Sequence, residues 1–258
     1  ATVADRIVSK EQSMYITSSQ GTKIAYHKIS GKSPGIVFFG GFMSDMTGTK
    51  ATYLESVCQR LGQAYVRFDY SGHGASSGKF EEGTIGSWLE DALCVLDNVT
   101  EGPQIIVGSS MGGWLMMLAA LKRPDRVKAL VGIASAPDFV EDLSHMNVVQ
   151  QEALIKNGIC YLPSHDGVMT YAITRHLITE GRTHSLLKAP IPIFCSVHLL
   201  HGLSDKDVPW QKSVKLAERL QSSEVTVTLI KDGDHRLSES AHLALLEKSV
   251  CSLIDVSG

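Results

Sequence analysis

Residues 104–116 read QIIVGSSMGGWLM, and this stretch indicates the fold. The apolar, β-branched run at 104–107 predicts a buried strand, and the apolar pattern over 110–121 predicts a helix that stops before Pro124. Between them lies the pattern G-x-S-x-G around Ser110, which is typical of a sharp strand-to-helix turn that exposes a nucleophilic serine. The stretch therefore predicts a strand, a tight turn and a helix, with Ser110 at the start of the helix.

Short apolar runs alternate with longer helical patterns along the rest of the chain. The predicted strands cover residues 14–17, 24–29, 36–39, 64–68, 104–107, 127–134, 197–200 and 225–230, and the predicted helices cover residues 49–61, 84–99, 110–121, 212–220 and 239–254. Polar turn residues between the first two strands predict an antiparallel hairpin there. The alternation after it implies right-handed crossovers, so we expect an α/β fold with a mostly parallel eight-stranded sheet and helices on both faces.

The composition is that of an ordinary globular protein. The chain has 258 residues, of which 43% are hydrophobic and 20% charged, so it can bury a large core without metal or disulfide staples. We expect a single domain, residues 1–258, because α/β folds of this length often form one unit. Residues 137–190 fit the sheet poorly, and we expect them to form a small inserted cap.

The charge balance and the apolar runs exclude two classes of protein. A net charge of −3 lacks the basic footprint of a nucleic-acid binder. The longest purely apolar run covers the eight residues 114–121, far short of the roughly 20 that span a bilayer, so we expect no integral membrane segment. The chain starts with Ala1 instead of Met, so we expect any targeting segment to be missing from this sequence.

The cysteines predict free thiols and no metal or cofactor. Five cysteines are scattered without a C-x-x-C arrangement, which favours a reducing compartment over a disulfide framework. No metal-ligand spacing such as H-E-x-x-H occurs either. We therefore expect no metal site and no cofactor.

Three serines stand in a G-x-S-x-G pattern: Ser33, Ser76 and Ser110. Ser33 comes before a predicted strand, in what we interpret as a loop, and Ser76 runs into a charged segment instead of a helix. Ser110 alone follows a strand and opens a helix, whose N-terminus favours developing negative charge. Ser110 is therefore the predicted nucleophile. In the competing interpretation, Gly108 and Gly112 only permit a tight turn.

A serine nucleophile needs a base to take its proton and a carboxylate to orient that base. After Ser110, the predicted strand 197–200 leads into a loop with Asp205 and Asp207, and the strand 225–230 leads into a loop with His235. Both loops follow the carboxyl ends of strands, where ligands bind in open α/β sheets. We expect a triad of Ser110, Asp205 and His235. Asp207 is the alternative to Asp205, although its neighbour Lys206 suits it to a solvated role.

The segment after the predicted strand 36–39 is the candidate for the oxyanion hole. A glycine pair there turns the chain, and the backbone N–H groups of Phe42 and Met111 are the expected oxyanion donors. In the alternative interpretation the glycine pair turns the chain and does nothing else. Asp69 and His73 lie on another turn after a strand, and we expect them to hold that loop through backbone hydrogen bonds.

These motifs resemble the serine α/β-hydrolase family over essentially the whole chain. More narrowly, the chain resembles a subgroup of mitochondrial palmitoyl-protein thioesterases that also cleave acyl glucuronides. The resemblance is carried by residues 31–36, 48–51, 67–72, 102–116, 199–202, 208–210 and 234–236. It implies the α/β-hydrolase fold, mitochondrial location, and acylated proteins or small acyl esters as substrates. It also favours Asp205 over Asp207, because Asp205 occupies the aspartate position of a His-Gly-x-x-Asp-x-x-Val-Pro run.

The residues themselves indicate acyl transfer to water and leave the substrate open. A carboxylesterase, a lipase or a peptidase of other specificity is compatible with the same triad. An epoxide hydrolase or a dehalogenase would carry a carboxylate in the place of Ser110. A non-catalytic binding module of this fold would normally lack one triad member, and all three are present here. We expect an enzyme that acts as a monomer.

Overall fold

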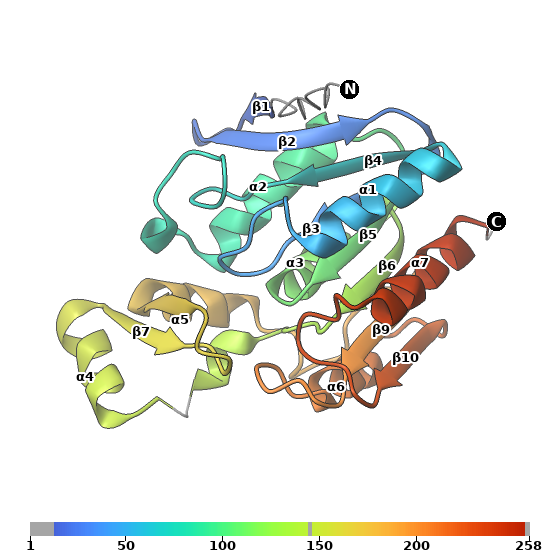
Figure 1. Cartoon of the computed structure of the whole chain (residues 1–258). Helices are drawn as coiled ribbons and strands as arrows, with labels where there is room; N and C mark the ends of the chain where they lie inside the picture. The colour runs from blue at the N-terminus through green and yellow to red at the C-terminus, as the bar shows by residue number, and fades with distance from the viewer. Residues whose placement is uncertain (1–12, 144–145, 256–258) are drawn as a thin grey trace, which may run out of the picture.

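An eight-stranded sheet forms the centre of the computed structural model, which describes residues 13–143 and 146–255 (Figure 1). Its strands lie in the order β1-β2-β4-β3-β5-β6-β9-β10. They are β1 (Met14–Thr17), β2 (Lys23–Ile29), β3 (Lys32–Phe39), β4 (Gln63–Phe68), β5 (Gln104–Ser109), β6 (Val127–Ile133), β9 (Ser196–Gly202) and β10 (Val225–Ile230). The β1–β2 and β2–β4 pairs are antiparallel and the others are parallel, which confirms the predicted sheet and its opening hairpin.

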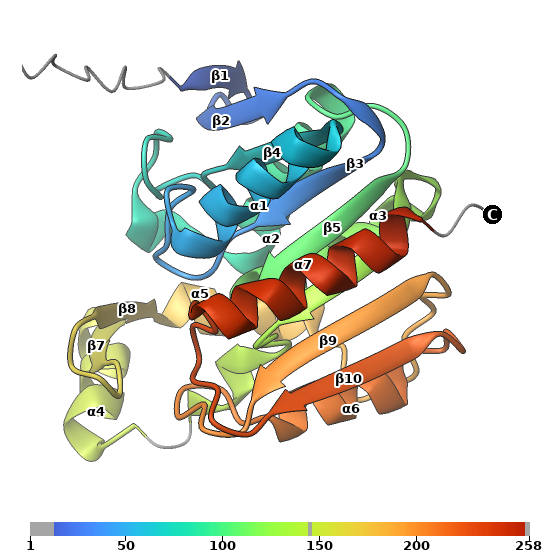
Figure 2. The same cartoon turned by 45° about the vertical axis from the view of Figure 1, so that its right-hand side comes forward.

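Helices cover both faces of this sheet, as predicted. One face is covered by α1 (Thr49–Leu61) and α7 (Ser240–Ile254), which lie in front of the sheet in Figure 2. The opposite face is covered by α2 (Ile85–Asn98), α3 (Met111–Lys122) and α6 (Gln211–Arg219). Short 3-10 helices, η1 (Phe80–Glu82) and η2 (Pro124–Arg126), lie in the connections.

The central strands are apolar on both sides because both faces are covered. In β3, Ile36 and Phe38 pack towards α1 and α7, whereas Val37 and Phe39 pack towards α2 and α3. All four side chains are buried. This two-sided burial explains why the run 36–39 is fully apolar instead of alternating.

The segment between β6 and β9 forms a separate layer beyond the carboxyl ends of the central strands (Figures 1 and 2). Its elements are η3 (Phe139–Glu141), α4 (Val148–Asn157), β7 (Ile159–Pro163), β8 (Thr170–Thr174), α5 (Arg175–Gly181) and η5 (Arg182–His184). β7 and β8 pair with each other in an antiparallel two-stranded sheet and not with the main sheet. The sequence predicted an insertion here but none of its elements. We call residues 137–190 the cap segment.

Polar contacts hold the two ends of the cap segment together. The buried carboxylate of Asp138 accepts hydrogen bonds from the backbone N–H groups of Leu186 (2.8 Å) and Leu187 (2.9 Å). The ammonium group of Lys212, on α6, donates to the Pro137 carbonyl at 2.5 Å. These bonds supply the donors that a buried carboxylate needs, and they join the two ends of the cap segment.

One local prediction, that of a loop around Ser33, is wrong. Ser33 does not lie in a loop, because β3 already begins at Lys32, which pairs with Gln63 before the register shifts at Ile36. All five cysteines are free, as expected. Among residues 13–143 and 146–255, no helix combines the length and the hydropathy needed to cross a bilayer.

Candidate active site

Ser110 lies in a strained turn between β5 and α3. Its φ of 55° and ψ of −114° are unusual for a residue with a side chain and cost on the order of 1–3 kcal/mol. A Cβ atom at Gly108 would lie 2.3 Å from the Gly112 carbonyl oxygen, and one at Gly112 would lie 2.0 Å from the Phe39 carbonyl oxygen. The G-x-S-x-G pattern is therefore a steric requirement for this turn.

His235 connects Ser110 to Asp205. The Nε2 atom of His235 lies 3.2 Å from Ser110 Oγ, and its Nδ1 atom lies 2.8 Å from Asp205 Oδ2. The three residues come from the carboxyl ends of β5, β9 and β10, and the loops that follow these strands meet. Both distances allow hydrogen bonds, so the geometry suits transfer of the Ser110 proton to His235.

Asp205 is held as a buried carboxylate. Its side chain is fully buried, and Oδ1 accepts the backbone N–H groups of Asp207 and Val208, both at 2.9 Å. Burial by itself raises the pKa of Asp205, but hydrogen bonds from His201 and His235 outweigh burial and hold this pKa well below its ordinary value. Asp205 is therefore ionised at neutral pH and can stabilise a charged His235 ring.

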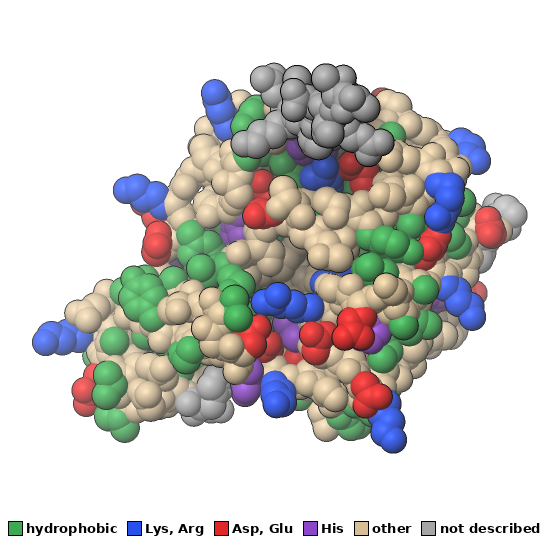
Figure 3. Space-filling model, viewed as in Figure 1, with side chains coloured by type: hydrophobic (Ala, Val, Ile, Leu, Met, Phe, Trp, Pro, Cys, Tyr) green, Lys and Arg blue, Asp and Glu red, His purple; other side chains and the backbone are tan. Residues whose placement is uncertain are grey.

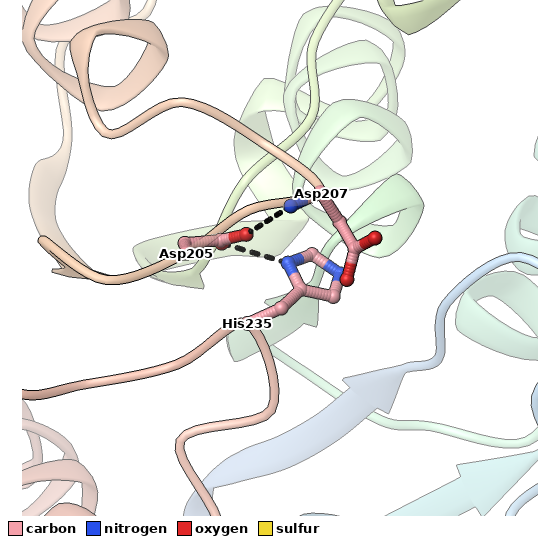
Figure 4. A group of neighbouring side chains, drawn as sticks. All are labelled: Asp205, Asp207 and His235. Atoms are coloured by element: carbon pink, nitrogen blue, oxygen red, sulfur yellow. Dashed lines mark hydrogen bonds and ion pairs between the residues drawn. The ribbon is translucent and has the colours of Figure 1, made fainter. Parts of the chain in front are cut away.

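Asp207 lies on the same loop but does not bond to His235 Nδ1. Figure 4 shows Asp205 directed at the His235 ring, while the side chain of Asp207 lies beyond the other side of the ring. The Asp207 carboxylate instead lies 3.3 Å from His165 Nδ1, in an exposed contact. The structure thus brings Asp205, and not Asp207, against the ring nitrogen that an orienting carboxylate must reach.

Donor atoms of Asp205, Asp207 and His235 lie within 4.8 Å of one another, a grouping that could in principle hold a metal ion. Both oxygens of Asp205 already accept hydrogen bonds, Oδ1 from two backbone N–H groups and Oδ2 from His235. These bonds account for the grouping, and we assign no metal to it.

The expected oxyanion donors lie beside Ser110. A Cβ atom at Gly41 would lie 3.6 Å from Ser110 Cβ, so the segment that leads into Phe42 passes close to the nucleophile. Met111 is the first residue of α3, where a backbone N–H has no partner within the helix. This placement is compatible with an oxyanion hole made by the N–H groups of Phe42 and Met111.

Asp69 and His73 hold the segment that carries Phe42. Asp69 Oδ1 accepts the Met46 N–H at 2.7 Å, and His73 Nε2 accepts the Met43 N–H at 3.1 Å. Both side chains are buried. The expected structural role of this pair is present in their own turn, where Asp69 Oδ2 accepts the Ala75 N–H at 2.9 Å. It extends to residues 40–46, which carry Phe42 and which we call the oxyanion segment.

Comparisons with known proteins show the family of this chain. A family model described as "alpha/beta hydrolase fold" matches residues 36–157. Palmitoyl-protein thioesterase ABHD10, mitochondrial, from Bos taurus is 47% identical over 236 residues, which cover 90% of this chain and 76% of the relative. The Homo sapiens protein of the same name is 45% identical, with the same coverage of 90% and 76%. This chain belongs to the ABHD10 family.

A solved ABHD10 structure has the same fold. Alpha/beta hydrolase domain-containing protein 10 from mouse superimposes with a TM-score of 0.88 at 45% identity, over 95% of this chain and 98% of that chain. The ABHD10 assignment confirms the expected family, the α/β-hydrolase fold and the expectation of a hydrolase.

In this ABHD10-family chain, the ring of Phe42 joins the main domain to the cap segment, a contact that sequence reasoning missed. Phe42 packs against Phe80 and Trp88 of the main domain and against Phe139 and Tyr171 of the cap segment, with ring centroids 5.0–5.9 Å apart. We call these five rings the aromatic cluster. It lies next to the expected oxyanion donors, because Phe42 is one of its five rings.

A polar cavity of about 240 Å³ lies on the His235 side of the ABHD10-family site. It is lined by His165, Asp166, Ser204, Lys206, Asp207, Asp234, His235 and Arg236. Figure 3 shows acidic, basic and histidine side chains gathered beside a hollow near the middle of this face. The site therefore has packed aromatic rings around Phe42 and a cavity lined by polar residues beside His235.

His201 is a further residue of this ABHD10-family site that the sequence analysis did not assign. Its ring is fully buried, with Nδ1 2.7 Å from Ser213 Oγ and Nε2 2.9 Å from the Val208 carbonyl and 3.2 Å from Asp205 Oδ2. His201 thus gives Asp205 a second imidazole neighbour. The four-residue spacing in His-Gly-x-x-Asp was the available signal, but it served only to locate Asp205.

We expect His201→Ala to lower kcat roughly tenfold or more, because a hydrogen bond to a charged group contributes about 1.5–3 kcal/mol. The measurement is kcat on an activated ester, expressed per active site titrated with a phosphonate so that unfolded protein does not count. Ser213→Ala is the matched control: it removes the outer partner of His201 and should reduce kcat less. Wild-type kcat in His201→Ala would show that Asp205 does not depend on this contact.

Proposed function

We propose that this protein is a serine hydrolase that releases palmitoyl and related acyl groups from cysteine thioesters of proteins. Small acyl esters, including acyl glucuronides, are proposed as further substrates. The observation that carries the proposal is the position of His235, 3.2 Å from Ser110 Oγ and 2.8 Å from Asp205 Oδ2. The names of the relatives, palmitoyl-protein thioesterases, support the acyl group and the thioester.

In the proposed reaction, Ser110 Oγ attacks the acyl carbonyl while His235 Nε2 takes its proton. Asp205 keeps the ring in place and stabilises its positive charge. The N–H groups of Phe42 and Met111 hold the oxyanion, and His235 then protonates the leaving thiol or alcohol. Water then attacks the acyl-enzyme while His235 takes its proton, and His235 returns that proton to Ser110 Oγ as the acid leaves.

The two sides of the site suit the two parts of such a substrate. The aromatic cluster is apolar and lies beside the oxyanion segment, so we assign it to the acyl chain. The polar cavity lies beside His235, which protonates the leaving group, so we assign it to the polypeptide or sugar part. A peptidase would protonate an amine at the same place, so the cavity does not separate a peptidase from an esterase. A non-catalytic binding module would not need Ser110 and His235 to be aligned.

The direct test compares three substrates with one acyl chain and one peptide: an S-palmitoyl cysteine thioester, an O-palmitoyl serine ester and the corresponding amide. We expect turnover of the thioester and the ester, no turnover of the amide, and no turnover of any of them by Ser110→Ala. An acyl glucuronide in the same assay tests the second substrate class. Amide cleavage without thioester cleavage would overturn the proposal in favour of a peptidase.

If the cap segment and Phe42 form an acyl groove, longer chains should react faster. Each buried CH₂ contributes about 0.8 kcal/mol, which is about fourfold in kcat/KM, until the groove is full. Tyr171→Ala should reduce the gain per CH₂, because Tyr171 belongs to the aromatic cluster. Tyr161→Ala is the matched control, since Tyr161 lies on the same hairpin but is 58% exposed. A flat kcat/KM from short to long chains would mean that no such groove exists.

We also propose that the monomer is the active unit and that it acts in mitochondria. The triad and both expected oxyanion donors come from one chain, so no second copy is needed to complete the site. The relatives are named as mitochondrial proteins. Size-exclusion chromatography with activity measured across the peak tests the first point, and fractionation of cells tests the second.

A further inference from the structure

Lys50 connects α1 to the loop that carries His235. It lies in the first turn of α1, and its ammonium group donates a hydrogen bond to the backbone carbonyl of Arg236, the residue directly after His235. The same carbonyl accepts a hydrogen bond from Ser238 Oγ at 3.2 Å. Lys50 therefore holds the chain immediately beyond the imidazole ring.

Other hydrogen bonds hold the backbone of the His235 loop on either side of the ring. Gly233 accepts the Ser204 N–H at 3.0 Å before the ring, and Asp234 Oδ1 accepts the Leu237 N–H at 2.9 Å after it. Lys50 differs because it is 186 residues away in the chain from its acceptor, on the helix that follows the oxyanion segment. Its hydrogen bond thus joins α1, the helix that follows the segment carrying Phe42, to the loop carrying the proposed base.

The charge of Lys50 is sensitive to alkaline pH. The pKa of Lys50 is lowered to about 8, chiefly by burial and also by the charge of Arg236, while the charge of Asp234 acts in the opposite direction. Arg236 itself pairs with Asp166 of the cap segment. A charge-assisted hydrogen bond is roughly twice as strong as a neutral one, so loss of the proton weakens the contact without abolishing it.

We infer that Lys50 is a positioning residue, whose ammonium group holds the Arg236 carbonyl so that the His235 ring reaches both Ser110 and Asp205. The inference rests on the proposed roles of Ser110 and His235 and not on the identity of the acyl group. Deprotonation of Lys50 loosens the His235 loop and slows the attack by Ser110.

The experiment measures the rate of phosphonate labelling of Ser110 and kcat/KM for an activated ester, from neutral to alkaline pH. The wild type should show a partial fall with a midpoint near pH 8. Lys50→Met should react roughly tenfold more slowly at neutral pH and show no midpoint near pH 8. Methionine cannot donate the hydrogen bond to the Arg236 carbonyl at any pH. Lys50→Arg keeps the charge at all these pH values, so its labelling rate and kcat/KM should match those of the wild type at neutral pH. Neither should fall at alkaline pH.

Lys122→Met, at the exposed end of α3, is the control and should keep both the rate and the midpoint. A folded Lys50→Arg that still shows the midpoint near pH 8 would overturn the inference, as would a Lys50→Met with the wild-type rate. Lys50→Arg decides the matter alone if Lys50→Met does not fold. A wild type that is labelled but cleaves no thioester would overturn the proposed substrate and leave this measurement intact.

Discussion

Ser110→Ala is expected to abolish turnover of esters and thioesters and to remove phosphonate labelling. Loss of the nucleophile in a serine hydrolase lowers kcat by a factor on the order of 10⁶, because the remaining groups can only bind the substrate and polarise it. The strained turn should tolerate alanine, since the neighbouring glycines provide the close approach to the Phe39 carbonyl and alanine adds no atoms. The variant should therefore fold and serve as an inactive reference.

Ser33→Ala and Ser76→Ala are the controls, because both serines stand in the same sequence pattern. Ser33 is exposed at the amino end of β3, away from the carboxyl ends where the triad meets. Ser76 Oγ donates to the Asp69 carbonyl at 2.7 Å and accepts the Ala25 N–H at 2.9 Å, so its loss should cost stability of about 1 kcal/mol but little activity. Labelling that survives in Ser110→Ala would contradict the assignment of the nucleophile.

The second large effect is expected for Asp205→Asn, with a loss of about 10⁴ in kcat. An amide in this position can present an N–H group to His235 Nδ1, which stabilises the wrong tautomer of the ring. Asp207→Asn should cost less than about tenfold, because an exposed charge contributes little to the transition state. The Asp207 carboxylate contacts His165 and not His235 Nδ1, so its removal leaves the orienting bond in place.

Both variants are measured by kcat on one activated ester, with active sites titrated first. They are a matched pair, since each replaces a carboxylate by an amide in the same loop. If Asp207→Asn is the variant that loses activity and Asp205→Asn is not, the third member of the triad is wrong.

The strands, the main helices and the Ser110 turn could be predicted from the sequence because their causes are local. The apolar run 36–39 reflects burial on both faces of a strand, and the G-x-S-x-G pattern reflects close backbone contacts within a few residues of Ser110. His235 could be named because it follows the last strand, and the carboxyl ends of parallel strands meet at one edge of a sheet.

The sequence by itself therefore determined the eight strands of the main sheet along the chain, and it named Ser110 and His235 as the candidates for nucleophile and base. The resemblance favoured Asp205 over Asp207, but only the tertiary structure shows which of the two is buried against His235, since they differ in the contacts that surround them and not in chemistry. The ring contacts of Phe42 and the hydrogen bond from Lys50 to the Arg236 carbonyl likewise join residues far apart in the chain. Such pairs leave no periodic signal in the sequence, because they depend on how finished elements pack against one another.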